Sequence, residues 1–246
     1  MRGHRFSSEV IDHLASARKV VVLTGAGISA ESGVPTFRSP DGIWSKFKPE
    51  ELASMDSFMR NPKLVWEWYQ YRRRLIEKVK PNPGHHTLVE MEAHYPHFRL
   101  FTQNVDGLHH KAGSKEVYEL HGNIMRNRCT QCKRRFAQLP EDPAALLPRC
   151  KCGGFLRPDV VWFGETLPDE ELSLAYDEAV VADVYFTIGT SAVVYPAAHL
   201  PVLAAESGAY VIEINTETTA ISDHIHTTLY GKSGEILPAL WRQLRP

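Results

Sequence analysis

Short apolar segments that end in glycine or polar residues recur along this chain, and they constrain its fold more than any other feature. They span residues 19–23, 98–101, 116–120, 159–163, 183–188 and 209–214. Their β-branched and aromatic residues are typical of buried strands. Helix-like segments alternate with them, at residues 7–17, 85–95, 169–180 and 197–208. This alternation predicts an α/β fold with a doubly wound parallel sheet.

The polar residues at the ends of these segments indicate where a ligand would bind. In a doubly wound sheet, ligands lie beyond the carboxyl ends of the strands. Glycine, asparagine, aspartate, serine and threonine follow the predicted strands at those ends. We therefore expect the functional site along one edge of the sheet.

Two segments, 39–83 and 126–157, do not fit the alternation of strands and helices. The first looks helical and the second carries all the cysteines of the chain. We expect both to be insertions that form a smaller, helical and zinc-binding domain over the sheet edge. The large domain would then consist of residues 1–38, 84–125 and 158–246.

The cysteines form two tight pairs, Cys129 with Cys132 and Cys150 with Cys152, and 17 residues lie between the pairs. In a reducing compartment this grouping indicates a zinc site rather than a disulfide framework. The second pair departs from the usual two-residue spacing, but two glycines follow it and can relax the backbone. Four thiolates fill the coordination of Zn²⁺, so the metal would be structural. Free or redox-active cysteines are the alternative.

The charge balance argues against a protein dedicated to binding nucleic acid. The chain has 28 Lys and Arg against 29 Asp and Glu, a net charge of -1, whereas nucleic-acid binders carry a basic excess. No apolar run approaches the ~20 residues that span a bilayer, and the N-terminus lacks the apolar stretch of a signal peptide. We expect a cytoplasmic protein with no membrane partner and no direct nucleic-acid binding.

The sequence GAGISA follows the first predicted strand and matches a relaxed dinucleotide-binding pattern at Gly25, Gly27 and Ala30. Its glycines permit a tight turn and close approach of the backbone to a pyrophosphate. A plain strand–helix turn is the alternative. The acidic residue expected about 20 positions later in a dehydrogenase is missing, which argues against an ordinary dehydrogenase.

Four further strand ends carry polar groups. Gln103, Asn104 and Asp106 follow the second predicted strand, where amides can orient hydroxyls or a carboxamide and Asp106 can hold a carboxamide or fix its own loop. His121 follows the third, and an imidazole can act as a base near neutral pH. The sequences GTS (189–191) and NTE (215–217) end two later strands and suit phosphate and ribose.

The segment WEWYQYRRRLIEKVK (66–80) predicts a helix with an apolar seam at Val65, Trp68, Leu75 and Val79. Arg72 falls in this seam, where an unpaired charge is costly. Tyr69 lies three residues earlier and therefore on the same face. Arg72 could reach water or a local acid. Arg73 and Arg74 fall off the seam, and we expect both to be solvated or paired with Glu77.

Taken together, these motifs closely resemble those of the sirtuins. The shared sequences occur in the family's order over almost the whole chain: GAGISAESGVPTFR, TQNVDGLHHKAG, ELHGN, the two cysteine pairs, VVWFGE and GTSAVVYPAA. The resemblance implies one catalytic unit over 1–246, with a Rossmann-like large domain, one structural zinc per chain and NAD as a co-substrate. The family transfers an acyl group from lysine to ADP-ribose and releases nicotinamide.

The resemblance also implies roles for individual residues. His121 would be the base, with His109 the first alternative. The residues expected to contact NAD are Gly25, Ala26, Gly27, Ile28, Ala30, Pro35, Phe37, Arg38, Gln103, Asn104, Val105, Asp106, Gly189, Thr190, Ser191, Asn215, Thr216, Glu217 and Ser233. The extended substrate, an acyl-lysine protein or peptide, would contact Val161, Phe163, Gly164 and Val193.

The stretch Tyr69-Gln70-Tyr71-Arg72 looks like the Y-x-x-R signature of class III sirtuins. In that class the tyrosine and arginine hold the carboxylate of succinyl- or malonyl-lysine, and a guanidinium can bind a carboxylate through two parallel hydrogen bonds. A protein ADP-ribosyltransferase with the same NAD site is one alternative function. A zinc-ribbon binding protein without catalysis is another.

Overall fold

A six-stranded parallel sheet forms the larger half of the molecule in the computed structural model, which describes residues 5–35, 52–138 and 147–245. The strand order is β3-β2-β1-β7-β8-β9, and every pairing is parallel. The strands are β1 (Lys19–Thr24), β2 (His97–Thr102), β3 (Val117–Glu119), β7 (Val184–Ile188), β8 (Tyr210–Asn215) and β9 (Thr227–Tyr230). The predicted doubly wound sheet is confirmed.

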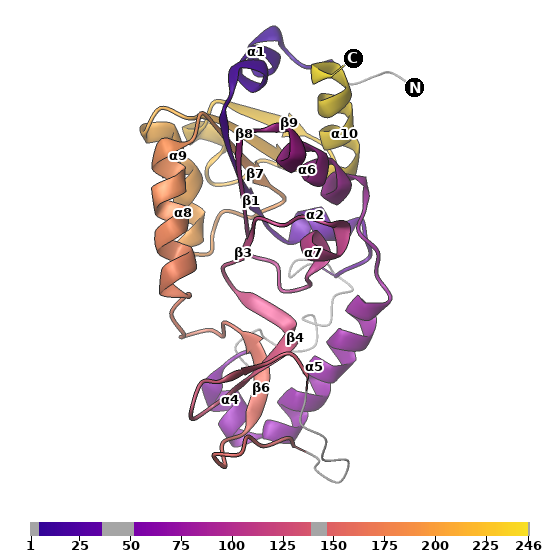
Figure 1. The fold of residues 1–246 in the computed structure, drawn as a ribbon, viewed down its shortest axis with the longest axis vertical. Coiled ribbons are helices and arrows are strands. Elements are labelled where there is room, and N and C mark those ends of the chain that lie inside the picture. The colour runs from indigo at the N-terminus through magenta and orange to yellow at the C-terminus, as the bar shows by residue number, and fades with distance from the viewer. Residues whose placement is uncertain (1–4, 36–51, 139–146, 246) are drawn as a thin grey trace.

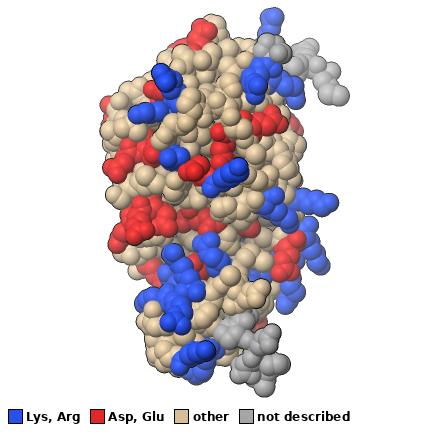
Figure 2. All heavy atoms as spheres, in the orientation of Figure 1, with Lys and Arg blue, Asp and Glu red and all other residues tan. Residues whose placement is uncertain are grey.

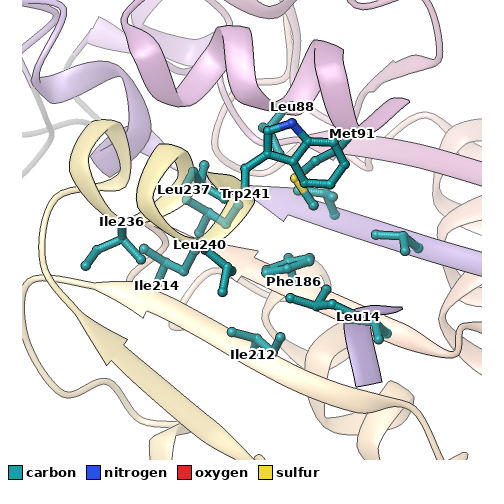
Figure 3. Close-up of a cluster of buried hydrophobic side chains, with 14 of the residues drawn as sticks. Leu14, Leu88, Met91, Phe186, Ile212, Ile214, Ile236, Leu237, Leu240 and Trp241 are labelled. Carbon is teal, nitrogen blue, oxygen red and sulfur yellow. The ribbon is translucent and has the colours of Figure 1, made fainter. Parts of the chain in front are cut away.

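Helices cover both faces of this sheet (Figure 1). One face packs against α1 (Ser8–Ser16), α6 (Pro83–His94) and α10 (Ser233–Leu244), and the other against α8 (Asp169–Val181) and α9 (Leu200–Glu206). Because successive strand residues point to opposite faces, Val20 and Val22 join the first cluster while Val21 and Leu23 join the second. Figure 3 shows the first cluster, in which the side chains of α10 lie over those of β7 and β8.

Short helices at the strand ends complete the large domain. They are α2 (Ala26–Ala30), α7 (Leu108–Ala112), η2 (Ala197–His199) and η3 (Ser222–His224). Within the described residues, no helix combines the length and the apolar composition that crossing a bilayer requires.

A smaller antiparallel sheet lies at the other end of the molecule (Figure 1). It has the order β5-β4-β6 and consists of β4 (Gly122–Cys129), β5 (Arg135–Phe136) and β6 (Leu156–Val160). Helices α4 (Met55–Arg60) and α5 (Pro62–Glu77) pack on it through a third apolar cluster that includes Phe58, Trp68 and Trp162. The helical and cysteine-bearing segments thus pack together as expected. The exact residue boundaries of the two domains stay a prediction.

One predicted strand belongs to a different sheet. Residues 159–163 were expected in the parallel sheet, but β6 ends at Val160 and pairs antiparallel with β4. A short apolar run reports burial and not the identity of its neighbour, so the pattern could not distinguish the two sheets.

Strand β4 was not predicted, because it carries charged residues where an apolar pattern was sought. Arg126 lies 2.6 Å from Glu119 and 3.3 Å from Asp159. Figure 2 shows acidic side chains gathered at mid-height of one face with basic side chains below them. Paired charges thus stabilise a strand that hydrophobicity alone does not mark.

Two buried histidines lie between α6 and α7. The ring centroids of His85 and His109 are 4.9 Å apart, and Nε2 of His109 lies 2.9 Å from the Thr24 hydroxyl. Burial lowers the pKa of His85 to about 4 and lowers the pKa of His109 well below its ordinary value. Both imidazoles are therefore neutral at pH 7 in the folded protein.

This pair makes the protein sensitive to acid. Since the pKa of His85 is about 4 in the folded protein and 6.5 in the unfolded chain, its contribution is complete above pH 6.5 and is lost as the pH falls toward 4. Between pH 7 and 4.5 we expect His85 to account for a loss of roughly 2–3 kcal/mol in the free energy of unfolding. Urea unfolding at both pH values measures it.

The matched variants are His85→Asn, which keeps an acceptor near the Asn82 N–H, and His199→Asn at an exposed position away from the pair. We expect a smaller acid-induced loss in the first and a wild-type loss in the second. An equal loss in wild type and His85→Asn would show that His85 does not titrate as described.

Candidate functional site

The loops that follow β1 and β7 are in contact through their glycine residues. The Gly25 N–H donates to the Ile188 carbonyl at 2.9 Å, and the Gly27 N–H donates to the Gly189 carbonyl at 2.8 Å. A Cβ atom on Gly27 would lie 2.6 Å from Cα of Gly189, and one on Gly25 would lie 2.7 Å from Cα of Thr190. Only glycine permits this approach. These two N–H groups are bonded within the protein.

Thr190 is the point where four strand ends meet. The Gln103 side-chain amide, after β2, donates to the Thr190 hydroxyl at 3.1 Å. The side-chain amide of Asn215, the last residue of β8, donates to the Thr190 carbonyl at 2.9 Å. The Asn104 side-chain amide donates to the Gly25 carbonyl at 2.9 Å. The strand ends that were predicted separately therefore form one polar edge.

Asp106 is buried and holds its own loop, since its carboxylate accepts the Leu108 N–H at 2.9 Å. Burial raises the pKa of Asp106, while the Leu108 N–H, the Ser29 hydroxyl and the charge of Arg72 oppose that rise. Ser29 also lies 3.3 Å from the Asn104 amide. Ser29 was not predicted, because a serine inside a short helix carries no distinguishing pattern.

His121 lies half-buried between β3 and β4, with Nδ1 2.9 Å from the Gln103 carbonyl. A carbonyl can only accept, so Nδ1 carries the proton and Nε2 of the neutral ring keeps its lone pair. Burial lowers the pKa of His121, and the Gln103 carbonyl only partly opposes it. The ring is therefore a neutral base at pH 7. His109 instead is fully enclosed and contacts Thr24.

Tyr69 and Arg72 lie on the face of α5 that turns toward the strand ends. Tyr69 is buried, and its hydroxyl accepts the indole N–H of Trp162 at 2.7 Å. The Arg72 guanidinium lies 5.0 Å from the Trp68 ring centroid. Burial lowers the pKa of Arg72, and the phenol oxygen of Tyr69 and the carboxylate of Asp106 oppose this shift. The charge of Asp106 thus links this pair to the polar edge.

Arg73 was expected in solvent or paired with Glu77, and the expectation of a solvated side chain is wrong. Its guanidinium is buried and donates to the Ile124 and Arg126 carbonyls at 2.6 and 3.0 Å and to the Asn127 side chain at 2.7 Å. The buried face of α5 is rotated from the predicted seam and consists of Val65, Trp66, Trp68, Tyr69, Arg73 and Ile76. Arg74 is exposed as expected.

The residues expected to contact the substrate border the same edge. Phe163 is 48% exposed, and its N–H donates to the Ala53 carbonyl. Val193 is 53% exposed. Val161 is half-buried and its N–H donates to the His121 carbonyl. Gly164 follows with a φ of +84°, which favours glycine. This arrangement leaves apolar side chains on both sides of the strand ends.

The remaining predicted residues are less closely engaged with the polar edge. Ser233 donates to Glu31 at the start of α10, so it reaches the end of α2. Val105 is half-buried and its carbonyl accepts the Ile124 N–H. Phe37 and Arg38 lie outside the described residues. Ile28 is buried, Ala26 and Ser191 are half-buried, and Ala30, Pro35, Thr216 and Glu217 are exposed.

The four cysteines meet at the far end of the small domain. The sulfurs of Cys129 and Cys152 are 3.4 Å apart, those of Cys132 and Cys150 are 3.6 Å apart, and all four lie within 4.8 Å of one another. These separations suit four thiolates around one Zn²⁺. A Cβ atom on Gly154 would lie 2.7 Å from the Cys129 sulfur. The cluster fits the predicted structural zinc.

We expect one zinc per chain, and we expect its removal to unfold the module before it affects chemistry. Chelation should lower the melting temperature by roughly 10 °C or more, because metal binding at such a site stabilises the fold. Elemental analysis measures the zinc content, and thermal unfolding measures the change in melting temperature. Zinc-saturated chelator is the control. Freshly purified protein without stoichiometric metal would contradict the assignment.

The family model described as Sir2 family matches residues 25–196. This chain belongs to the Sir2 family. An NAD-dependent protein deacylase of Aquifex aeolicus is 60% identical to this sirtuin over 82% of this chain and 85% of the relative. NAD-dependent protein deacylase 2 of Pyrobaculum aerophilum is 52% identical over 96% and 95% of the two chains.

Solved Sir2 structures share the fold of this sirtuin. A Sir2 homologue in complex with NAD superposes with a TM-score of 0.91 at 43% identity, covering 100% of this chain and 96% of the other. A variant Sir2 homologue in complex with 2′-O-acetyl ADP-ribose gives 0.90 at 44% identity, with 98% and 97% covered. A Sir2–p53 peptide–NAD⁺ complex gives 0.85 at 31% identity, with 97% and 98% covered.

Proposed function

We propose that this sirtuin is an NAD-dependent protein-lysine deacylase that removes acetyl groups and also succinyl or malonyl groups. The observation that carries the proposal is the neutral base His121, whose Nε2 lone pair is free while Nδ1 is bonded to the Gln103 carbonyl. Relatives at 50–60% identity are named NAD-dependent protein deacylases, which supports the same activity.

NAD would supply, when bound, the ADP-ribose that accepts the acyl group as nicotinamide leaves. The contacts of the strand ends support a cofactor site there, because Gly25 and Gly27 let the backbones of β1 and β7 meet without side chains between them. Asn104 and Gln103 present amides that can orient hydroxyls. His121 Nε2 can then take a proton from a hydroxyl held beside it.

Tyr69 and Arg72 support recognition of an acidic acyl group, the class III property. Burial raises the pKa of Tyr69, so its phenol stays protonated and can donate. The Arg72 guanidinium can donate two parallel hydrogen bonds to one carboxylate. Together these groups would hold the far end of a succinyl or malonyl chain.

The acyl-lysine would arrive on an extended protein segment. Phe163 and Val193 are exposed and offer apolar contacts to a substrate. The backbone of the two segments that carry them can pair with an added strand. The p53 peptide in a related Sir2 complex is a partner of this kind. We also retain the cytoplasm as the expected location and direct nucleic-acid binding as absent.

We expect His121→Ala to lower kcat by about 10²–10⁴-fold, because the step loses its general base. Since burial lowers the pKa of His121 from its ordinary 6.5, the acid limb of the wild-type kcat/KM profile should have its midpoint below pH 6.5. The control is His86→Ala, at an exposed position. Full activity of a folded His121→Ala enzyme would assign the base elsewhere.

We expect Arg72→Met to lower kcat/KM for a succinyl-lysine peptide by about ten- to more than a hundredfold, the equivalent of losing roughly 1.5–3 kcal/mol of charge-assisted hydrogen bonding. The same peptide with acetyl-lysine has no carboxylate and should lose little. The matched control is Arg74→Met on the exposed face of α5.

Two outcomes would contradict the proposed function. Equal losses on both peptides in Arg72→Met would make Arg72 a structural residue. Mass spectrometry that shows ADP-ribose attached to the peptide, with the acyl group retained, would favour the ADP-ribosyltransferase.

A further inference from the structure

Trp162 lies between the substrate segment and the acyl-binding pair, although neither the sequence motifs nor the proposed mechanism assigns it a role. It follows β6 directly and is buried. Its indole N–H donates to the Tyr69 hydroxyl at 2.7 Å. Its backbone N–H donates to Glu165 at 2.9 Å. The next residue, Phe163, is exposed and is one of the residues proposed to contact the substrate.

The indole ring is held from its face and its edge. The Arg157 guanidinium lies 3.5 Å from the ring centroid, and the Phe58 ring lies 5.4 Å from it. Arg157 is itself fixed by two hydrogen bonds to Glu165, at 2.5 and 2.8 Å. Glu165 therefore holds both the backbone of Trp162 and the cation above its ring. The direction of the indole N–H is determined by these contacts.

That direction restricts the phenol of Tyr69. A phenol has one proton to donate, and its oxygen can accept. Because an indole N–H can only donate, the Tyr69 oxygen must be the acceptor in this contact, and its own proton points elsewhere. Among the described residues, Trp162 is the hydrogen-bond partner of the Tyr69 hydroxyl. The phenol proton is therefore available for a ligand beside Arg72.

We propose that Trp162 is a positioning residue for acyl specificity: by donating to the Tyr69 hydroxyl, it directs the phenol proton toward the carboxylate of a succinyl or malonyl group. This inference rests on the proposed function, because it needs an acidic acyl group beside Arg72. Without the indole N–H, the Tyr69 hydroxyl can rotate so that its proton no longer points toward the carboxylate. Arg72 would then bind the carboxylate without a second, oriented donor from Tyr69.

Trp162→Phe tests the inference, because it deletes the indole N–H and keeps an aromatic ring next to Arg157 and Phe58, although it also removes part of the buried ring. We expect kcat/KM for a succinyl-lysine peptide to fall about 3- to 10-fold, the loss of one neutral hydrogen bond. The acetyl-lysine version of the same peptide should change less than about twofold. The ratio of the two values within one preparation does not depend on how much of the enzyme is folded.

A double-mutant cycle with Tyr69→Phe separates positioning from packing. If Trp162 acts through the phenol, Trp162→Phe should lower succinyl activity no further in the Tyr69→Phe background. The control is Trp241→Phe, which changes another buried tryptophan, in the core of the large domain. It should leave the succinyl-to-acetyl ratio at the wild-type value.

Equal losses on both peptides, or additive losses in the cycle, would overturn the inference about Trp162. The proposed function would still stand if the wild-type enzyme removed succinyl groups. A wild-type enzyme that removes acetyl but no acidic acyl group would overturn both, and the wild-type measurement alone would reveal it. A selective and non-additive succinyl loss supports the role of Trp162.

Discussion

The contact between the carboxyl ends of β1 and β7 is the constraint on which the rest of this sirtuin's site depends. Two glycines of one loop lie against Gly189 and Thr190 with no room for a Cβ atom. Because that contact fixes Thr190, the side-chain amides of Gln103 and Asn215 can both donate hydrogen bonds to this residue. Gln103 in turn presents the carbonyl that sets the protonation of His121. One backbone approach thus orders four strand ends and the His121 ring.

The small domain depends on a different principle, the pairing of buried charges. Arg73 and Arg157 are both buried: Arg73 donates to backbone carbonyls and the Asn127 side chain, and Arg157 donates to the Glu165 carboxylate. A buried charge that loses its partner is strongly destabilising. These arginines therefore tie α5 to β4, and β6 to the loop that follows it. Tyr69 and Arg72, which are proposed to bind the acyl group, lie on the helix that Arg73 holds against β4.

Much of the architecture could be predicted, because burial on both faces leaves continuous apolar runs whose polar ends mark the ligand edge. The zinc cluster was also predictable, since two tight cysteine pairs have few other uses in a reducing compartment. Arg73 was missed because a small rotation of a helix changes which of two adjacent arginines is buried, and helical periodicity does not resolve it. Ser29 and Trp162 act through contacts between distant segments, which no local pattern reports.

The most direct measurement is a crystal structure of the enzyme with a succinyl-lysine peptide and a non-hydrolysable NAD analogue. The account predicts the succinyl carboxylate within about 2.7–3.2 Å of both the Arg72 guanidinium and the Tyr69 hydroxyl. It also predicts that Trp162 still donates to Tyr69 and that Nε2 of His121 faces the ribose. A carboxylate turned to solvent, with Arg72 bonded only to the protein, would contradict it.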